Sequence, residues 1–148
     1  MSELRNKALK LLSQREHSRQ ELRRKLQGGE EADREAIEAL LDDLVERNWL
    51  SDARFAVAYV DANAARFGRF RLENELRERG VADDAIREAL AQLPSEDDEL
   101  SRAREVWCKK FRQPPQDAAE RAKQARFMQT RGFGFDIIRK VLGGLDDE

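Results

Sequence analysis

An internal repeat constrains the fold of this chain more than any other feature. Two stretches 52 positions apart share six residues: RGVADDAIREAL, from Arg79 to Leu90, and RGFGFDIIRKVL, from Arg131 to Leu142. In each stretch a glycine stands where a helix would stop, because glycine adopts the left-handed conformation without a Cβ penalty. An isoleucine and a leucine then follow four residues apart, on one helical face. The repeat predicts a stacked helical array, a class that usually binds other macromolecules.

Helical spacing of apolar residues recurs along all 148 residues, and no strand-like alternation of any length interrupts it. The pattern predicts an all-α fold of about nine helices, arranged as an elongated tandem array of three three-helix repeats. The expected repeats are residues 1–50, 51–93 and 94–148. Capping boxes are expected at Ser18 with Glu21 and at Ser95 with Asp98. Breaks are expected at Gly28–Gly29, Pro114–Pro115 and Gly143–Gly144.

The residues predicted to hold each repeat together are its inward leucines and isoleucines and its stop glycines. They are Leu22, Leu26, Leu72, Leu76, Gly80, Ile86, Leu90, Gly132, Ile138 and Leu142. The helix after Ser51 is predicted to turn Phe55, Ala58, Tyr59, Ala62 and Ala65 inward. The helix of residues 118–130 is predicted to bury Ala118 or Ala119, Ala122, Ala125 and Met128, with Phe127 competing for the inward direction.

Charged residues make up 39% of the chain, against about 25% in ordinary soluble domains. The net charge is only −2, but the charges come in blocks. Residues 1–28 carry eight Lys/Arg and three Asp/Glu, whereas residues 29–54 carry three and nine; residues 109–140 again carry nine and three. Blocks of this kind are typical of a surface with separate basic and acidic faces, or of solvated helices with local ion pairs.

Nothing in the sequence indicates an enzyme, a cofactor or a metal site. Cys108 is the only cysteine and is expected to be a partly buried, inert thiol. His17, the only histidine, lacks the partners that acid–base chemistry needs and is expected to cap or bridge. The paired aspartates, such as Asp83–Asp84, are expected to cap and solvate helices. With no apolar run of membrane-spanning length and no signal peptide at the start, a cytoplasmic location is expected.

Basic residues that project away from the inward faces are the candidates for partner binding. They are Arg24, Arg66, Arg69, Arg71, Arg77, Arg126, Arg131 and Lys140. Two arginines beside the stop glycines, Arg79 and Arg131, are alternatively helix C-caps. The others belong either to solvated surface or to a contact with a charged partner.

Four segments, in order, resemble the RecX family of bacterial regulators of the RecA recombinase. They are ALKLLSQREHSRQELRRKL from Ala8, LVERNWLSDARFAVAYV from Leu44, FRLENELRERGV from Phe70 and QARFMQTRGFGFDII from Gln124. The likeness covers nearly the whole chain and implies three tandem three-helix repeats. The loop Phe67–Gly68–Arg69–Phe70 is tighter than the family's usual loop, and the stretch from Ala118 to Ala125 is less bulky.

The resemblance implies a non-enzymatic protein that binds RecA filaments along their groove and inhibits filament growth, ATP hydrolysis and strand exchange. The expected partner is the RecA filament, with weak or indirect contact to single- or double-stranded DNA, no membrane and a monomeric state. One alternative is a direct DNA-binding module similar to helix-turn-helix domains, which the net charge of −2 disfavours. Another is a helical scaffold for a different protein.

Overall fold

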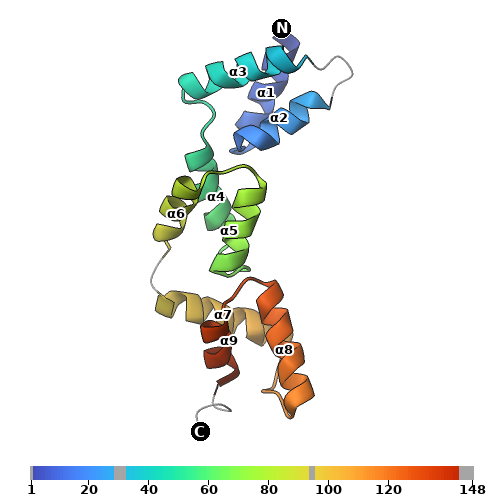
Figure 1. The fold of residues 1–148 in the computed structure, drawn as a ribbon, viewed down its shortest axis with the longest axis vertical. Coiled ribbons are helices and arrows are strands. Elements are labelled where there is room, and N and C mark those ends of the chain that lie inside the picture. The colour runs from blue at the N-terminus through green and yellow to red at the C-terminus, as the bar shows by residue number, and fades with distance from the viewer. Residues whose placement is uncertain (1, 29–32, 94–95, 144–148) are drawn as a thin grey trace. The chain divides into compact units, whose positions relative to one another are not determined.

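The fold is all-α, as the sequence predicts. The computed structural model describes residues 2–28, 33–93 and 96–143, and within these ranges it contains nine helices and no strand (Figure 1). In chain order they are α1 (Ser2–Gln14), α2 (Arg19–Gln27), α3 (Arg34–Glu46), α4 (Asp52–Asn63), α5 (Arg69–Glu78), α6 (Asp83–Ala91), α7 (Glu96–Lys110), α8 (Ala118–Thr130) and α9 (Phe135–Leu142).

The helices belong to two compact units. One unit comprises Met1–Tyr59 with Leu76–Ala89, and the other comprises Val60–Glu75 with Leu90–Glu148. The division passes through α4 and α5, so each of these helices contributes one end to each unit. The middle repeat therefore supplies residues to both units.

Side-chain caps fix where several helices begin. Ser18 and Glu21 form the predicted capping box: Ser18 Oγ accepts from the Glu21 N–H at 3.1 Å, and the Glu21 carboxylate accepts from the Ser18 N–H at 3.2 Å. Ser51 Oγ accepts a backbone N–H at 3.1 Å from the first turn of α4. Such a cap satisfies an N–H group that has no partner inside the helix. The second predicted box involves Ser95, which lies outside the described residues.

The two stop glycines of the repeat both adopt the left-handed conformation that the sequence predicts. Gly80 follows α5 with φ of +86°, and Gly132 follows α8 with φ of +95°. Other residues lack this freedom because a Cβ atom collides with the backbone there. Each glycine is thus the point where one helix ends and the chain turns into the next.

The other predicted glycine breaks lie partly outside the described residues. Gly28 follows the end of α2 but has right-handed backbone angles, with φ of −68°. Gly143 follows α9 with φ of +54°. Their neighbours Gly29 and Gly144 lie outside the described residues.

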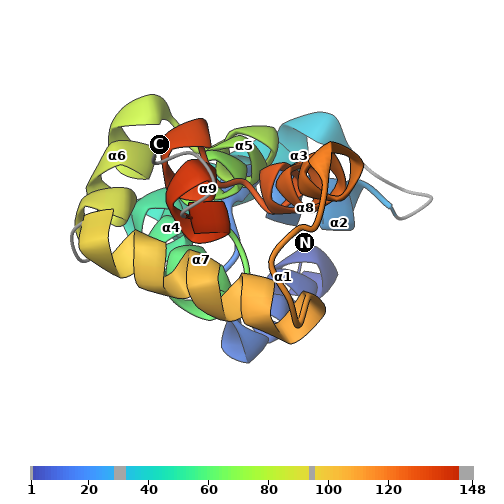
Figure 2. The same ribbon diagram turned by 90° about the horizontal axis from the view of Figure 1, so that it is seen from below.

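Each unit has an apolar core of its own. In the first unit, α2 packs against α1 and α3. The buried residues of this core are Ala8, Leu22, Leu26, Ile37, Leu40, Leu41, Leu44 and Leu50. In the second unit, α9 packs against α7 and α8, as Figures 1 and 2 both show. The buried residues there are Ala103, Met128, Phe133, Ile138 and Leu142.

The predicted inward face of α4 is wrong for most of its residues. Phe55 is buried as expected, but the other buried residues of this helix are Ala56, Val60 and Asn63. The predicted Ala58, Ala62 and Ala65 are exposed. Alanines lie on several sides of this helix, and a methyl group is a weak indicator of an inward face because it buries little apolar area.

The predicted face of α8 is also wrong in part. Met128 is buried, but Ala118, Ala119 and Ala122 are exposed. Gln124, four residues before Met128, is also buried and is 1% exposed. Its Oε1 accepts a hydrogen bond from Trp107 Nε1 at 2.8 Å, and its Nε2 donates to the carbonyl of Gln113 at 3.2 Å. A buried amide is tolerated when both its ends are bonded in this way.

Across the described ranges, each helix falls short of the length or the apolar character that crossing a membrane requires.

Candidate functional site

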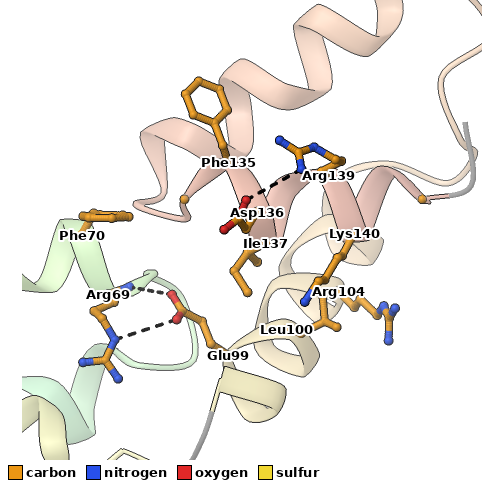
Figure 3. A pocket seen from close by; sticks show the side chains of 12 residues that line it. Arg69, Phe70, Glu99, Leu100, Arg104, Phe135, Asp136, Ile137, Arg139 and Lys140 are labelled. Carbon is orange, nitrogen blue, oxygen red and sulfur yellow. Dashed lines mark hydrogen bonds and ion pairs between the residues drawn. The ribbon is translucent and has the colours of Figure 1, made fainter. Parts of the chain in front are cut away.

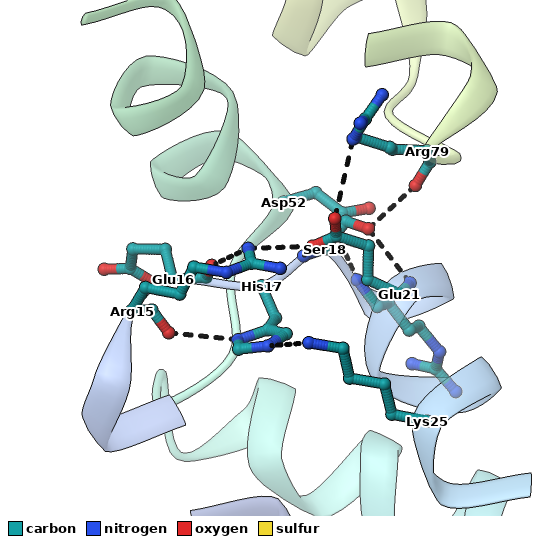
Figure 4. Close-up of polar contacts among 9 residues, drawn as sticks. Arg15, Glu16, His17, Ser18, Glu21, Lys25, Asp52 and Arg79 are labelled. Carbon is teal, nitrogen blue, oxygen red and sulfur yellow. Dashed lines mark hydrogen bonds and ion pairs between the residues drawn. The ribbon is translucent and has the colours of Figure 1, made fainter. Parts of the chain in front are cut away.

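A polar junction in the first unit ties the start of α2 to the end of α5 (Figure 4). Ser18 Oγ donates to the carbonyl of Arg79 at 2.8 Å, and Gln20 Nε2 donates to the carbonyl of Glu78 at 2.8 Å. On the same turn, the Arg19 N–H donates to Asp52 Oδ1 at 2.7 Å. These bonds use backbone groups at helix ends, which otherwise lack partners within their own helices. The first repeat is thereby joined to residues of the second.

Arg79 has a structural position at this junction. Its Nε lies 3.5 Å from Glu21 Oε2, and its guanidinium lies over the ring of Tyr59, 4.8 Å from the ring centre. A second arginine, Arg54, donates from Nε to Glu16 Oε2 at 2.9 Å. Because Arg79 precedes a stop glycine, the sequence offered helix C-capping as one possible role for it. Its side chain instead pairs with Glu21, the capping-box glutamate of α2.

His17 is 1% exposed and lies under this junction. Its Nδ1 is 3.0 Å from the carbonyl oxygen of Arg15, and its Nε2 is 3.0 Å from Lys25 Nζ. Burial lowers the pKa of His17 from its ordinary value. The histidine bridges two parts of the first unit, one of the two roles that the sequence left open.

A second junction, within the other unit, ties the start of α5 to the end of α8. The Gly68 N–H donates to the carbonyl of Arg131 at 2.7 Å, and the Phe70 N–H donates to the carbonyl of Gly132 at 3.0 Å. Nη1 of Arg71 donates to the carbonyl of Thr130 at 3.1 Å. A Cβ atom on Gly68 would lie 2.5 Å from the Gly132 oxygen, so only glycine permits this approach.

The two junctions are built to the same plan. Ser18 and Gly68 are fifty residues apart, as are Arg19 and Arg69. Ser18 and Gly68 each donate a hydrogen bond to the carbonyl of the arginine that precedes a stop glycine. Arg19 and Arg69 each donate a backbone N–H to a carboxylate. For Arg69 that carboxylate is Glu99, with Oε2 at 3.0 Å. Each carboxylate comes from the first helix of the following repeat, α4 or α7.

Arg102 reinforces the second junction, and sequence reasoning missed it. Its Nε donates to the carbonyl of Ala64 at 2.7 Å, and its Nη2 donates to the carbonyl of Phe67 at 3.1 Å. Burial lowers the pKa of this guanidinium, while the nearby Glu99 opposes the shift. The only available signal was an arginine one residue before the buried Ala103, which is weak because such positions are usually solvated.

A groove of about 930 Å³ opens beside this junction, entirely within the second unit (Figure 3). We call it the α7–α9 groove. It is lined by Arg69, Phe70, Glu99, Leu100, Arg104, Gly134, Phe135, Asp136, Ile137, Arg139, Lys140 and Gly143. Leu100 and Ile137 lie between the Arg69–Glu99 pair and the side chains of Arg104 and Lys140. The groove therefore joins an apolar strip to several cations.

The eight basic residues predicted to bind a partner fall on both units. Arg24 and Arg77 belong to the first unit, where both are exposed and Arg77 pairs with Asp83 at 3.2 Å. The remaining six belong to the second unit, where Arg69 and Lys140 line the α7–α9 groove. Arg126 is exposed on α8 and has no polar partner among the described residues.

The other three basic candidates have local contacts. Arg66 is exposed, and it and Arg71 lie over the ring of Phe67, at 4.8 Å and 4.0 Å from the ring centre. The Arg71 side chain also pairs with Glu75 at 3.2 Å. Arg131 lies over the ring of Phe127 at 4.9 Å. Cation–π contacts and bonds to backbone carbonyls give Arg71 and Arg131 a structural role irrespective of any partner.

Two expectations about reactive groups come out differently. Cys108 is exposed, not partly buried, because it lies on the solvent side of α7, one residue beyond Trp107. The pair Asp42–Asp43 is among the paired aspartates expected at helix starts, but Asp43 lies near the end of α3 and accepts from Arg5 at 2.6 Å and from Arg47 at 2.9 Å. In the described part of the chain, no group of three or more His, Cys, Asp or Glu is arranged to hold a metal ion.

Sequence reasoning also missed the two aromatic residues of the groove. Phe70 is 57% exposed and Phe135 is 69% exposed. Phe135 follows the buried Phe133 at a distance of two residues, and the intervening Gly134 is the residue before α9. The sequence RGFGF offered two phenylalanines with no means of telling which one is buried, because Phe133 precedes α9 and Phe135 is its first residue, where no preceding helical turn fixes the direction of the side chain.

Family models match three successive parts of the chain. RecX, first three-helix domain, matches residues 5–44; RecX, second three-helix domain, matches residues 51–90; and RecX, third three-helix domain, matches residues 96–142. The three matches follow the order of the helices. The exact repeat boundaries at 50 and 93, and the elongated arrangement, stay predictions.

Curated relatives match over almost the full chain. A regulatory protein RecX from Chromobacterium violaceum is 49% identical over 146 residues, 98% of this chain and 93% of the relative. One from Ralstonia nicotianae is 48% identical over 97% of this chain and 88% of the relative. One from Neisseria meningitidis serogroup C is 38% identical over 98% and 92%.

Solved structures share the fold. The crystal structure of RecX from Lactobacillus salivarius matches with a TM-score of 0.77 at 23% identity, covering 95% of this chain and 93% of that one. A crystal structure of regulatory protein RecX matches with a TM-score of 0.81 at 21% identity, covering 95% and 71%. At this level of identity the likeness concerns the fold.

Proposed function

This chain belongs to the RecX family, and from that membership we propose that it is a non-enzymatic regulator of the RecA recombinase. It binds RecA filaments on DNA and inhibits filament growth, ATP hydrolysis and strand exchange. The observation that carries the proposal is the 49% identity to a regulatory protein RecX over 98% of the chain. The matched span includes both junctions and both units.

The distribution of exposed cations supports the proposal. Arg24 lies in the first unit, and Arg126 and Lys140 lie in the second, and all three are exposed. A partner that repeats along a filament presents equivalent surfaces at intervals, and separate contacts to such a partner add through effective concentration. Complementary charges also raise the association rate, so binding to the filament is expected to weaken as the salt concentration rises.

The test is a RecA ATPase assay on single-stranded DNA. RecA filaments are assembled on circular single-stranded DNA, the purified full chain is added, and ATP hydrolysis is followed with time. The expected result is a progressive fall in the hydrolysis rate at concentrations of the chain well below that of RecA, because arrested growth leaves filaments to disassemble. A heat-denatured sample of the chain serves as the control. An unchanged rate with the chain in excess over RecA would reject the proposal.

A further inference from the structure

Two exposed phenylalanines, Phe70 and Phe135, line the α7–α9 groove. The Phe70 N–H donates to the carbonyl of Gly132, and the Phe70 ring lies against Gly134, where an added Cβ would be 2.8 Å from a ring carbon. Phe135 starts α9 directly after Gly134. Exposed apolar side chains of this size that lie close together indicate a binding surface. Because the contact with Gly134 already positions the Phe70 ring, a ligand that stacks on this ring finds it pre-organised.

The charge around the rings is positive. Arg104 and Lys140 are exposed and have no hydrogen bond or ion pair with any described residue. The two acids of the groove are already neutralised. Glu99 is 8% exposed and its Oε1 lies 3.9 Å from Nε of Arg69, and Asp136 lies 3.8 Å from Arg139. An anion entering the groove therefore meets cations whose charge is not cancelled locally.

We propose that the α7–α9 groove binds single-stranded nucleic acid. Bases stack on Phe70 and Phe135, and phosphates lie along Arg104 and Lys140. Sites that hold single strands combine aromatic stacking platforms with a cationic path for the backbone. The rings are exposed by more than half, so their faces are accessible for stacking, and the cations that line the groove favour an anionic ligand. Duplex is disfavoured, since its bases are already stacked on one another.

The proposal goes beyond the regulation of RecA, and its test contains no recombinase. Binding of the full chain to a fluorescent thymidine homopolymer is measured by anisotropy at low salt, with an oligomer longer than the ~4–16 nucleotides that one single-strand-binding domain covers. The expected result is salt-sensitive binding to the homopolymer. An abasic oligomer of the same length should bind more weakly, because it keeps the phosphates and lacks the bases.

Variants separate stacking from charge. Phe70→Ala and Phe135→Ala should each weaken homopolymer binding about 5- to 150-fold, the range expected for losing one stacked base. Phe135→Trp should keep binding, and its fluorescence should be quenched when a base stacks on it. Lys140→Gln should flatten the slope of log affinity against log salt by about 0.7, the value for one phosphate on a single strand. Lys123→Gln, an exposed lysine of α8 that does not line the groove, should leave the slope unchanged.

The controls keep every outcome informative. Trp49→Ala removes an exposed aromatic residue of the first unit and should bind as the parent does. If Phe70→Ala lowers the melting temperature, Phe70→Leu keeps the apolar contact with Gly134 and still lacks the π face. The proposal is overturned if the parent does not bind the homopolymer, or if both alanine variants bind it as tightly as the parent. It is also overturned if the abasic oligomer or a polyglutamate peptide binds as well, because the groove is then a site for acidic peptides or for any polyanion.

Discussion

Lys25 Nζ lies 3.0 Å from Nε2 of the buried His17. An ammonium group only donates hydrogen bonds, so Nε2 must accept, and the proton of a neutral ring then resides on Nδ1. Nδ1 faces the carbonyl oxygen of Arg15 at 3.0 Å, which accepts it. A protonated ring places a second N–H against the Lys25 ammonium. Burial is the main cause that lowers the pKa of His17, and the charges of Arg15 and Lys25 lower it further.

The first prediction concerns the stability of the fold in mild acid. Because the folded-state pKa of His17 is below its ordinary value of 6.5, the unfolded chain binds the proton more readily. The contribution of His17 to stability is therefore complete above pH 6.5 and is lost as the pH falls from 6.5 through the folded pKa. Melting temperatures followed by circular dichroism should decrease over this interval. In His17→Gln the decrease should be smaller; equal slopes in both proteins would contradict the assignment.

The second prediction concerns the stability of the fold at lower pH. The Glu38 carboxylate accepts from Arg23 and from Arg19, and these hydrogen bonds lower its pKa from 4.5 to about 2. The sign is the usual one for a carboxylate: its stabilising contribution is present above pH 4.5 and is lost as the pH falls toward 2. Chemical denaturation at several pH values should therefore show a shallower acid dependence in Glu38→Gln. Glu46→Gln, an exposed residue at the end of α3, should behave as the parent.

The third prediction compares three glycines. Gly132→Ala should destabilise the protein by more than the ~1–2 kcal/mol cost of the left-handed conformation, because the new Cβ also lies 2.5 Å from the Arg71 backbone nitrogen. Gly143 has φ of +54° and ψ of −178°, a backbone conformation that is essentially restricted to glycine, but the space around it is open, so Gly143→Ala should show a conformational cost without a collision. Gly28→Ala has right-handed angles and ordinary contacts, so it should be neutral or slightly stabilising. Urea midpoints that do not follow this order would disprove the geometry at Gly132.

The fourth prediction separates function from solvation on the basic surface. Arg126→Glu and Lys140→Glu should weaken the inhibition of RecA and leave the melting temperature nearly unchanged, because both residues are exposed and lack polar partners among the described residues. The difference between each variant and the parent should shrink as salt is added, because salt screens the charges that the variants reverse. The matched controls are Arg34→Glu and Arg87→Glu, which are equally exposed but lie in acidic stretches. Arg47 is unsuitable as a control, since it pairs with Asp43 and lies over Trp49.

Much of the fold is predictable from local chemistry. The capping box at Ser18, the stop at Gly80 and the stop at Gly132 each depend on a rule that acts within a few residues. The leucines and isoleucines at four-residue spacing, such as Ile138 and Leu142, are buried because a helix with one apolar face has only one way to cover it.

What escaped prediction depends on contacts between distant residues. Gln124 is buried because Trp107, seventeen positions away, supplies its hydrogen bond. Arg102 is held by carbonyls of a loop 35 or more positions earlier. The α7–α9 groove exists only once α5, α7 and α9 have met, so no local pattern marks Phe70 as a residue of its rim. The predicted inward face of α4 was wrong for a different reason. An alanine side chain has little apolar area to bury, so its position does not indicate which side of a helix faces the core.

The junctions also bear on how such a chain can change over generations. At both of them the acceptor is a main-chain carbonyl, that of Arg79 or of Arg131, and no substitution can remove a carbonyl. The donor is a hydroxyl in one copy and a backbone amide in the other. Duplicated segments joined in this way keep the hydrogen bonds between them while their side chains diverge in sequence. Each copy can therefore acquire a different surface.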